Sequence, residues 1–244
     1  MLNSVEAHYE KHLAPIYSWM VGDFDSACSN AGLFLDSIGL PAGQGRRAVD
    51  LGCGHGIYSI PLARRGYEVV GVDNSKQLLE ELESAKGKGK LSVKLMDLVE
   101  FMARSDHDSV FAVVCMGDTL THLASEKDVE SMIADSARCL NREGWLVLSF
   151  RDYVTTELMG AKRFIPVRSD DQRIHTCFLE YQSERVWVHD VIHNRKESGW
   201  EMSVSAYPKL RLDPKSVVSC ATRNGLKLAH ESTDRGMLYL AFCP

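Results

Sequence analysis

The sequence lacks three features that would place it in a specialised class of proteins. Its seven cysteines are odd in number and include no C-x-x-C pair, which argues against a disulfide framework and a zinc cluster. It has no basic excess, since 28 Lys and Arg face 33 Asp and Glu, so it carries no electrostatic footprint for nucleic acid or an anionic membrane. No apolar run reaches the roughly 18 residues of a membrane span, and the first residues contain no signal-like apolar core, so we expect a soluble, cytoplasmic protein.

The length and composition favour one α/β domain with additions. The chain has 244 residues, of which 45% are hydrophobic, enough for a sizeable core. The net charge of −5 favours a small-molecule partner over nucleic acid or a membrane.

Residues 46–75 organise the rest of the sequence. Residues 47–51 form a short apolar run, three glycines that permit a tight turn follow, and residues 57–65 continue at helical spacing. A second apolar and β-branched run, residues 68–72, ends at Asp73. The order of strand, glycine turn, helix, strand and acid predicts a nucleotide-binding unit.

The charge next to the turn indicates the kind of nucleotide. The glycines are Gly52, Gly54 and Gly56, preceded by Asp50, whereas dinucleotide sites of the G-x-G-x-x-G type bind a pyrophosphate at the helix N-terminus. A carboxylate about 4 Å from a phosphate would repel it by roughly 4 kcal/mol at an effective dielectric of 20, and would attract a sulfonium by as much. The turn therefore favours a cationic ligand, and Asp73 is placed to accept hydrogen bonds from ribose hydroxyls.

At these residues the sequence resembles a known family. The segments VDLGCGHG (49–56) and VVGVDNS (69–75) are similar to the first two motifs of the class I S-adenosylmethionine-dependent methyltransferases, with both acids and the glycines in register. The resemblance covers residues 46–150 and, more loosely, the C-terminal hairpin. It implies a doubly wound, Rossmann-like α/β fold whose seven-stranded sheet has an antiparallel last strand. It also implies S-adenosylmethionine as cofactor, S-adenosylhomocysteine as product, and no metal.

The resemblance assigns residues to the cofactor. Asp50 and the glycine loop are expected at its methionine end, Asp73 at the ribose, and Asp97 at the adenine amino group. Asp97 also begins a sequence with capping-box spacing up to Glu100, and the two roles are compatible. The full set expected at the cofactor is Asp50, Gly52, Cys53, Gly54, Gly56, Asp73, Asn74, Met96, Asp97, Leu98, Met116, Gly117 and Asp118.

The loop after the predicted fourth strand, residues 109–116, is expected to lie between cofactor and acceptor. Ligands of an open α/β sheet bind at the carboxyl ends of its strands, where residues 116–122 leave the sheet. This loop has no N-P-P-Y-like sequence, which disfavours DNA as substrate. His122 is a candidate general base near pH 7, although a lone histidine after a strand more often has a structural role.

Two helices are predicted before the nucleotide unit, at residues 3–20, interrupted at Pro15, and at residues 24–38. In the resemblance such a segment covers the cofactor and lines the acceptor pocket. The residues expected to close that pocket are Tyr9, His12, Tyr17 and Trp19, and the alternative is that each aromatic only fills the core. Together with His122, we take Tyr17 and His12 as the catalytic candidates.

An antiparallel β insertion is predicted after the fifth strand, residues 144–150. Residues 177–181, 185–193 and 200–206 have strand composition and turn-like breaks between them, and this sheet is expected to roof the active site. His189 and His193 imitate a helical metal motif, but on a strand they lie about 13 Å apart, too far for one metal ion. The insertion and the end of the fifth strand add three candidate substrate ligands: Arg151, Tyr153 and Arg168.

These patterns divide the chain into four parts. They are a helical cap (1–45), a cofactor-binding core (46–150), the insertion (151–211), and a C-terminal helix and hairpin (212–244) that complete the core sheet. The function they favour is methyl transfer by direct displacement to a small-molecule acceptor, an amine- or carboxylate-bearing metabolite. The alternatives are an NAD(P)-dependent oxidoreductase and a non-catalytic regulatory protein that binds S-adenosylmethionine.

Overall fold

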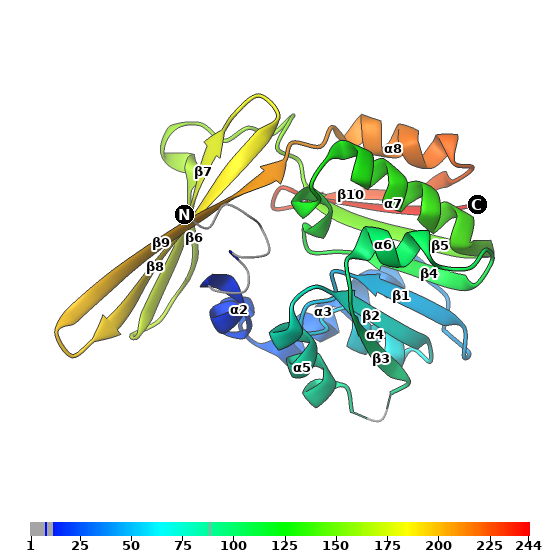
Figure 1. Cartoon of the computed structure of the whole chain (residues 1–244), viewed down its shortest axis with the longest axis horizontal. Coiled ribbons are helices and arrows are strands. Elements are labelled where there is room, and N and C mark those ends of the chain that lie inside the picture. The colour runs from blue at the N-terminus through cyan, green and yellow to red at the C-terminus, as the bar shows by residue number, and fades with distance from the viewer. Residues whose placement is uncertain (1–7, 9–11, 88) are drawn as a thin grey trace.

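The α/β core is built on one seven-stranded sheet. The computed structural model describes residues 8, 12–87 and 89–244. The strand order β10-β11-β5-β4-β1-β2-β3 places the first strand of the sequence near the middle, and only β11 runs antiparallel to its neighbours (Figure 1). This confirms the predicted doubly wound sheet with an antiparallel last strand. The strands are β1 (Arg47–Leu51), β2 (Glu68–Asp73), β3 (Leu91–Leu95), β4 (Val110–Cys115), β5 (Leu140–Arg151), β10 (Lys227–Asp234) and β11 (Met237–Cys243).

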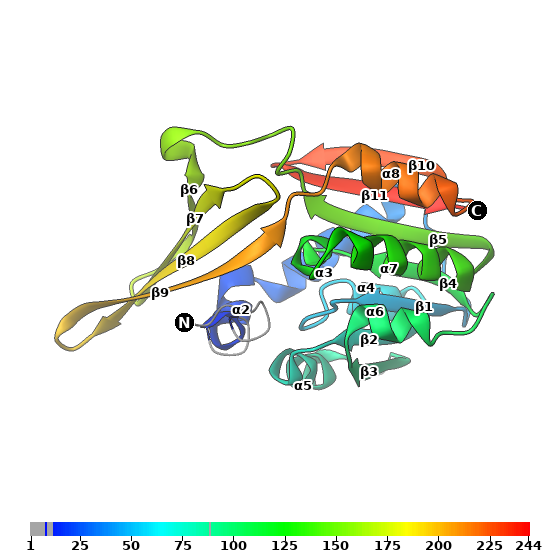
Figure 2. The same cartoon turned by 45° about the horizontal axis from the view of Figure 1, so that its top comes forward.

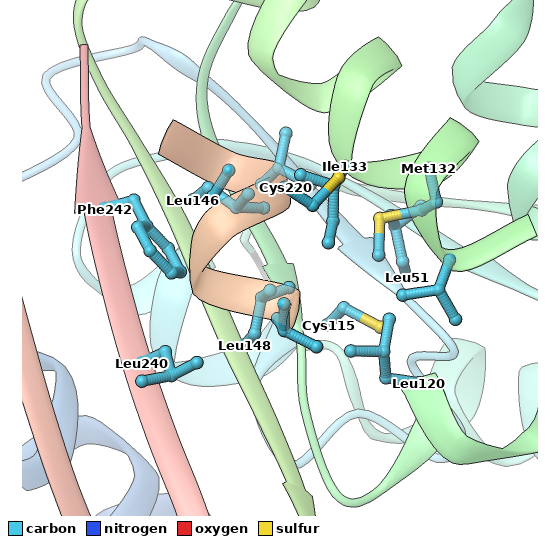
Figure 3. Packing of buried hydrophobic residues seen from close by; sticks show 14 of the residues in the cluster. Leu51, Cys115, Leu120, Met132, Ile133, Leu146, Leu148, Cys220, Leu240 and Phe242 are labelled. Carbon is cyan, nitrogen blue, oxygen red and sulfur yellow. The ribbon is translucent and has the colours of Figure 1, made fainter. Parts of the chain in front are cut away.

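Helices cover both faces of this sheet. Every residue of β4 is buried, as expected for a strand with helices on both sides. One face packs against α6 (Leu98–Ala103), α7 (Glu126–Cys139) and α8 (Pro214–Arg223), where Met132 and Ile133 belong to one hydrophobic cluster with Leu146, Leu148 and Phe242 (Figure 3). The other face packs against α3 (Phe24–Ser37), α4 (Ser59–Arg64) and α5 (Lys76–Ala85).

A second, four-stranded antiparallel sheet projects from one end of the core (Figures 1 and 2). It confirms the predicted β insertion and adds a strand that was not predicted, β6. Its strands, in spatial order, are β6 (Phe164–Ser169), β7 (Arg173–Tyr181), β8 (Arg185–Lys196) and β9 (Gly199–Leu210).

The N-terminal helix α2 (Ala14–Val21) lies where the second sheet meets the core (Figure 2). Leu13 and Ile16 pack on Val188 and Ile192 of β8, so this helix and the sheet share a small hydrophobic cluster. Pro15 occupies the first turn of α2, where its missing N–H has no intrahelical partner to lose. The part of the predicted first helix before residue 12 lies outside the described residues, apart from His8. In the described part of the chain, each helix is too short or too polar to traverse a bilayer.

Candidate cofactor and acceptor site

The turn after β1 depends on backbone conformations that glycine adopts readily. Gly52 and Gly54 have φ angles of +67° and +52°. A Cβ atom on Gly52 would stand 2.3 Å from Cγ2 of Thr119, so the chain after β4 approaches this turn closely. The glycines therefore let two loops meet at the carboxyl edge of the sheet.

Asp73, at the end of β2, fastens this turn. Its Oδ2 accepts a hydrogen bond from the Gly54 N–H at 2.8 Å, and its Oδ1 accepts one from the Ser75 N–H at 2.8 Å. Burial raises the pKa of Asp73, although these N–H groups oppose the shift. Each carboxylate oxygen can accept a second hydrogen bond, so Asp73 keeps acceptor capacity for a ligand.

The first cavity, of about 260 Å³, opens beside this turn. Nine of the thirteen residues expected at the cofactor line it, as do the catalytic candidates Tyr17 and His122; Leu78, Thr119, Leu123 and Ala124 were not predicted. The lining residues are Tyr17, Gly52, Gly54, Asp73, Asn74, Leu78, Met96, Asp97, Leu98, Met116, Gly117, Thr119, His122, Leu123 and Ala124.

Three residues expected at the cofactor, Asp50, Cys53 and Gly56, lie behind the turn. They are not among the residues that line the first cavity. Asp50 is 2% exposed and accepts a hydrogen bond from Ser59 Oγ at 2.5 Å. Burial, opposed by that hydrogen bond, raises its pKa to about 7, so Asp50 is only partly ionised at neutral pH. Cys53 is buried, and a Cβ on Gly56 would meet Leu82 at 2.3 Å, so both support the turn through packing. The fourth, Asp118, lines the second cavity instead.

Asp97 has a capping role. Its Oδ1 accepts hydrogen bonds from the N–H groups of Val99 and Glu100, both at 2.9 Å, and it is the N-cap of α6. The capping prediction is confirmed. Because Asp97 also lines the first cavity, its contact with adenine stays a prediction that the cap does not obstruct.

The second cavity, of about 520 Å³, adjoins the first, and Tyr17, Gly117 and His122 line both. Its walls come from α2, the loop after β4, the end of β5 and the inner face of the second sheet. Among its lining residues are Asp118, Arg151, Tyr153, His175, Cys177, Asp190, Tyr207 and Lys209.

Asp118 joins the second sheet to the core inside this cavity. Its Oδ1 accepts from the N–H of Arg151 at 2.8 Å, and its Oδ2 accepts from Lys209 Nζ at 2.6 Å and Tyr153 Oη at 3.3 Å. Although burial alone raises the pKa of Asp118, the Lys209 ammonium and the N–H of Arg151 lower it below its usual value. Asp118 is therefore a buried carboxylate with three donors.

The two catalytic candidates at the junction of the cavities are both uncharged. Burial, helped by the Lys209 ammonium, lowers the pKa of His122 to about 3, and its ring stacks on Tyr207 with centroids 5.4 Å apart. Burial, helped by the Asp73 carboxylate, raises the pKa of Tyr17 to about 12. At neutral pH His122 is a neutral imidazole, and Tyr17 keeps its phenolic proton.

Three other predicted residues, Trp19, Arg168 and His12, are not among those that line either cavity. Trp19 Nε1 donates to Asp170 at 2.5 Å, and the Arg168 guanidinium lies 5.4 Å from the Trp19 ring. The ring of His12 is 5.3 Å from that of His8, and burial and His8 lower its pKa. Tyr9 lies outside the described residues.

Sequence reasoning missed Lys209, Tyr207 and the polar group His175, Cys177 and Asp190. The available signal was the i, i+2 spacing of polar residues at 175 and 177, but the predicted strand began only at residue 177, whereas β7 begins at Arg173 and places both side chains on one face. Which face lies against the core could not be read from that spacing.

Comparisons with known proteins find methyltransferases. Residues 48–144 match the family model of a methyltransferase domain. A glycine/sarcosine N-methyltransferase from Halorhodospira halochloris is 30% identical over 132 residues, 54% of this chain and 49% of that protein. A ubiquinone biosynthesis O-methyltransferase from Alkalilimnicola ehrlichii is 34% identical over 107 residues, 43% and 42% of the two chains. The matched region thus spans about half the length of these curated relatives.

Solved structures extend the likeness of fold to nearly the whole chain. The CcbJ methyltransferase from Streptomyces caelestis has a TM-score of 0.77 at 19% identity, covering 98% of both chains. The amino pentose methyltransferase CalS10 from Micromonospora echinaspora, solved with S-adenosylmethionine bound, has a TM-score of 0.74 at 15% identity, covering 96% of this chain and 97% of that one. Residues 48–144 therefore match a methyltransferase domain, and nearly the whole chain has a fold similar to that of these solved methyltransferases.

Proposed function

We propose that this protein transfers the methyl group of S-adenosylmethionine to the nitrogen of a small-molecule amine. The observation that carries the proposal is the junction of the two cavities at Tyr17, Gly117 and His122. A cofactor in the first cavity and an acceptor in the second would meet there. The acceptor cavity, about 520 Å³, falls within the roughly 300–1,000 Å³ of small-ligand sites.

The first cavity fits the cofactor by the chemistry of its walls. Asp73 has unused acceptor capacity for ribose hydroxyls, and Asp97 bonds the helix through Oδ1, which leaves Oδ2 for an N–H donor. Leu78, Met96 and Leu98 supply apolar surface for a purine. When bound, S-adenosylmethionine supplies a methyl group already activated by the positive sulfur.

The walls of the second cavity favour a polar acceptor without a large net charge. Its acids Asp118, Asp152 and Asp190 are matched by Arg151, Lys209 and Arg235. Two similarities support an amine: the relatives named glycine/sarcosine N-methyltransferases, and a solved sugar N-methyltransferase from Streptoalloteichus with a TM-score of 0.71 at 15% identity.

The residues at the junction are better suited to position the two reactants than to transfer a proton. A base with a pKa of about 3 holds a proton weakly, so His122 is better suited to accept a hydrogen bond from the amine and orient its lone pair. Holding two reactants in attack geometry contributes several kcal/mol to catalysis without covalent chemistry from the protein. We therefore expect a neutral amine to be the form that reacts.

The test is transfer of label from methyl-labelled S-adenosylmethionine. The protein is incubated with glycine, sarcosine and a panel of amino sugars, and separately with a cell extract divided into small molecules and macromolecules. Label in small amines supports the proposal, and the product mass identifies the acceptor. Label only in protein or nucleic acid overturns it, as does tighter calorimetric binding of a reduced nicotinamide than of S-adenosylhomocysteine. Asp73→Ala is the control for cofactor-independent label.

A further inference from the structure

A buried polar cluster lies on the inner face of the second sheet. His175 and Cys177 are two residues apart on β7 and so share a face, and Asp190 of β8 pairs directly with Cys177 across the strands. All three line the second cavity. Apolar residues lie beside them on this face, among them Leu179, Val188 and Ile192, and Ser205 of β9 pairs directly with Asp190.

The three side chains converge on one point. His175 Nε2 lies 2.7 Å and Cys177 Sγ 2.8 Å from the same oxygen, Asp190 Oδ1, and Sγ and Nε2 are 3.7 Å apart. The other oxygen, Oδ2, lies 2.9 Å from His8 Nε2. An ionised side chain on an apolar face costs free energy unless it is paired, and the side chains of His8, His175 and Cys177 pair Asp190.

The spacing fits ligands of one tetrahedral metal ion. Zinc bonds of about 2.3 Å to sulfur and 2.0 Å to nitrogen place those two atoms about 3.5 Å apart, close to the 3.7 Å between Cys177 and His175. The same geometry requires the Asp190 oxygen to move back by several tenths of an ångström. All three ligand atoms already lie within 4.8 Å of one another.

We propose that His175 Nε2, Cys177 Sγ and Asp190 Oδ1 bind one divalent transition-metal ion, zinc by the chemistry of this ligand set, on the wall of the second cavity. Nitrogen, sulfur and carboxylate oxygen together suit zinc, and three protein ligands leave its fourth position for a donor atom from the cavity. Binding releases the Cys177 thiol proton to solvent, and the His175 proton moves from Nε2, where it faces Asp190 Oδ1, to Nδ1, so that the imidazole stays neutral. His8 holds the second carboxylate oxygen, as outer partners of metal ligands do.

This proposal concerns binding and does not rest on methyl transfer, so the two can fail separately. The test starts from the 244-residue chain, treated with chelator and then dialysed. Cobalt(II) is titrated in, and the thiolate-to-cobalt absorption band is followed. We expect one equivalent per chain, displaced by one equivalent of zinc, and a higher melting temperature with metal because metal binds only the folded site.

Variants locate the binding site. Cys177→Ser should abolish the thiolate band, and His175→Gln and Asp190→Asn should each weaken cobalt affinity at least about tenfold. Two control variants replace a histidine and a cysteine that lie outside the cluster. They are His189→Gln, on the opposite face of β8 where His189 contacts Glu180, and Cys243→Ser, at the end of β11. Binding of S-adenosylhomocysteine verifies that each variant is folded.

Three results would overturn the proposal. The wild-type chain could bind no equivalent of cobalt or zinc, in which case the cluster is only a hydrogen-bonded network. Folded Cys177→Ser could keep the band, or the control variants could lose it to the same degree. If Cys177→Ser does not fold, His175→Gln and the metal-dependent melting of the wild type still decide the question.

Discussion

Lys209 Nζ donates a hydrogen bond to Asp118 Oδ2 at 2.6 Å, which joins β9 of the second sheet to the loop after β4. Lys209 is 8% exposed and Asp118 3%, so the pair is shielded from water. Asp118 also has a positive φ of 75°, a conformation that is uncommon for residues other than glycine. The ion pair therefore fixes both the roof of the second cavity and the loop between the cavities.

Replacing Lys209 with methionine should destabilise the protein strongly. The change leaves Asp118 buried without its cation, and breaking a buried pair on one side costs about 3–5 kcal/mol. Asp118→Asn combined with Lys209→Met should recover part of this loss, because the uncompensated charge is then gone. Urea unfolding of the two single variants and the double variant measures the coupling. Additive single effects would mean that the two side chains act independently.

The core was predictable because its signals are local. The segment from β1 to β2 contains a buried strand, a glycine turn and an acid within about thirty residues, and all of these features predict the same nucleotide-binding unit. Strand β6 was not predicted, because Pro166 and three charged or polar residues near it obscure the alternation of a six-residue edge strand. The second sheet's other strands were predicted because they are longer and separated by polar turns.

The site was predictable where it follows the motif and not where it depends on tertiary contacts. Asp73 and Gly54 are linked by spacing that the motif specifies. Lys209 meets Asp118 across 91 residues, and no pattern near Lys209 distinguishes it from a surface lysine. The sequence pattern drew attention to His189 and His193 and not to Asp190 between them. Which of these side chains points inward depends on which face of the strand meets the core, and the sequence does not specify that face.

Asp73→Ala should weaken the binding of S-adenosylhomocysteine by roughly ten- to a hundredfold. The change removes the carboxylate that accepts from Gly54 and Ser75, and hydrogen bonds to charged groups contribute about 1.5–3 kcal/mol each. Isothermal titration calorimetry measures the affinity, and Asp106→Ala, an exposed carboxylate, is the control. Wild-type affinity in Asp73→Ala would remove the ribose assignment.

Gly52→Ala should cost more stability than Gly45→Ala. Both glycines have positive φ, so each alanine meets backbone strain of roughly 1–2 kcal/mol. Only at Gly52 does the new Cβ also collide with Thr119, since nothing lies within 4 Å of the Cβ position at Gly45. Thermal unfolding compares the two variants, and adding Thr119→Ser to Gly52→Ala should recover part of the difference by removing Cγ2. Equal costs at both positions would show that the close approach of the two loops is not rigid.

The stability of the protein should fall with rising pH through the titration of Asp50. Its pKa rises from an ordinary value of about 3.8 to about 7 in the folded chain. Between these values the folded state holds a proton that the unfolded state has released, so the free energy of unfolding decreases as pH rises, by at most about 1.4 kcal/mol per pH unit. Above pH 7 both states are ionised and this contribution stops changing.

Asp50→Asn isolates that contribution, because asparagine fills the same space and does not titrate. Urea unfolding at each pH measures the free energy of unfolding of both proteins. From pH 5 to pH 7 that of the wild type should fall relative to that of Asp50→Asn, and above pH 7 the difference should stay constant. Asp106→Asn, at an exposed carboxylate, should run parallel to the wild type over this range. A constant difference for Asp50→Asn would mean that Asp50 is already ionised at pH 5. In that case the turn would carry a full negative charge behind its glycines, the condition under which the argument for a cationic ligand is strongest.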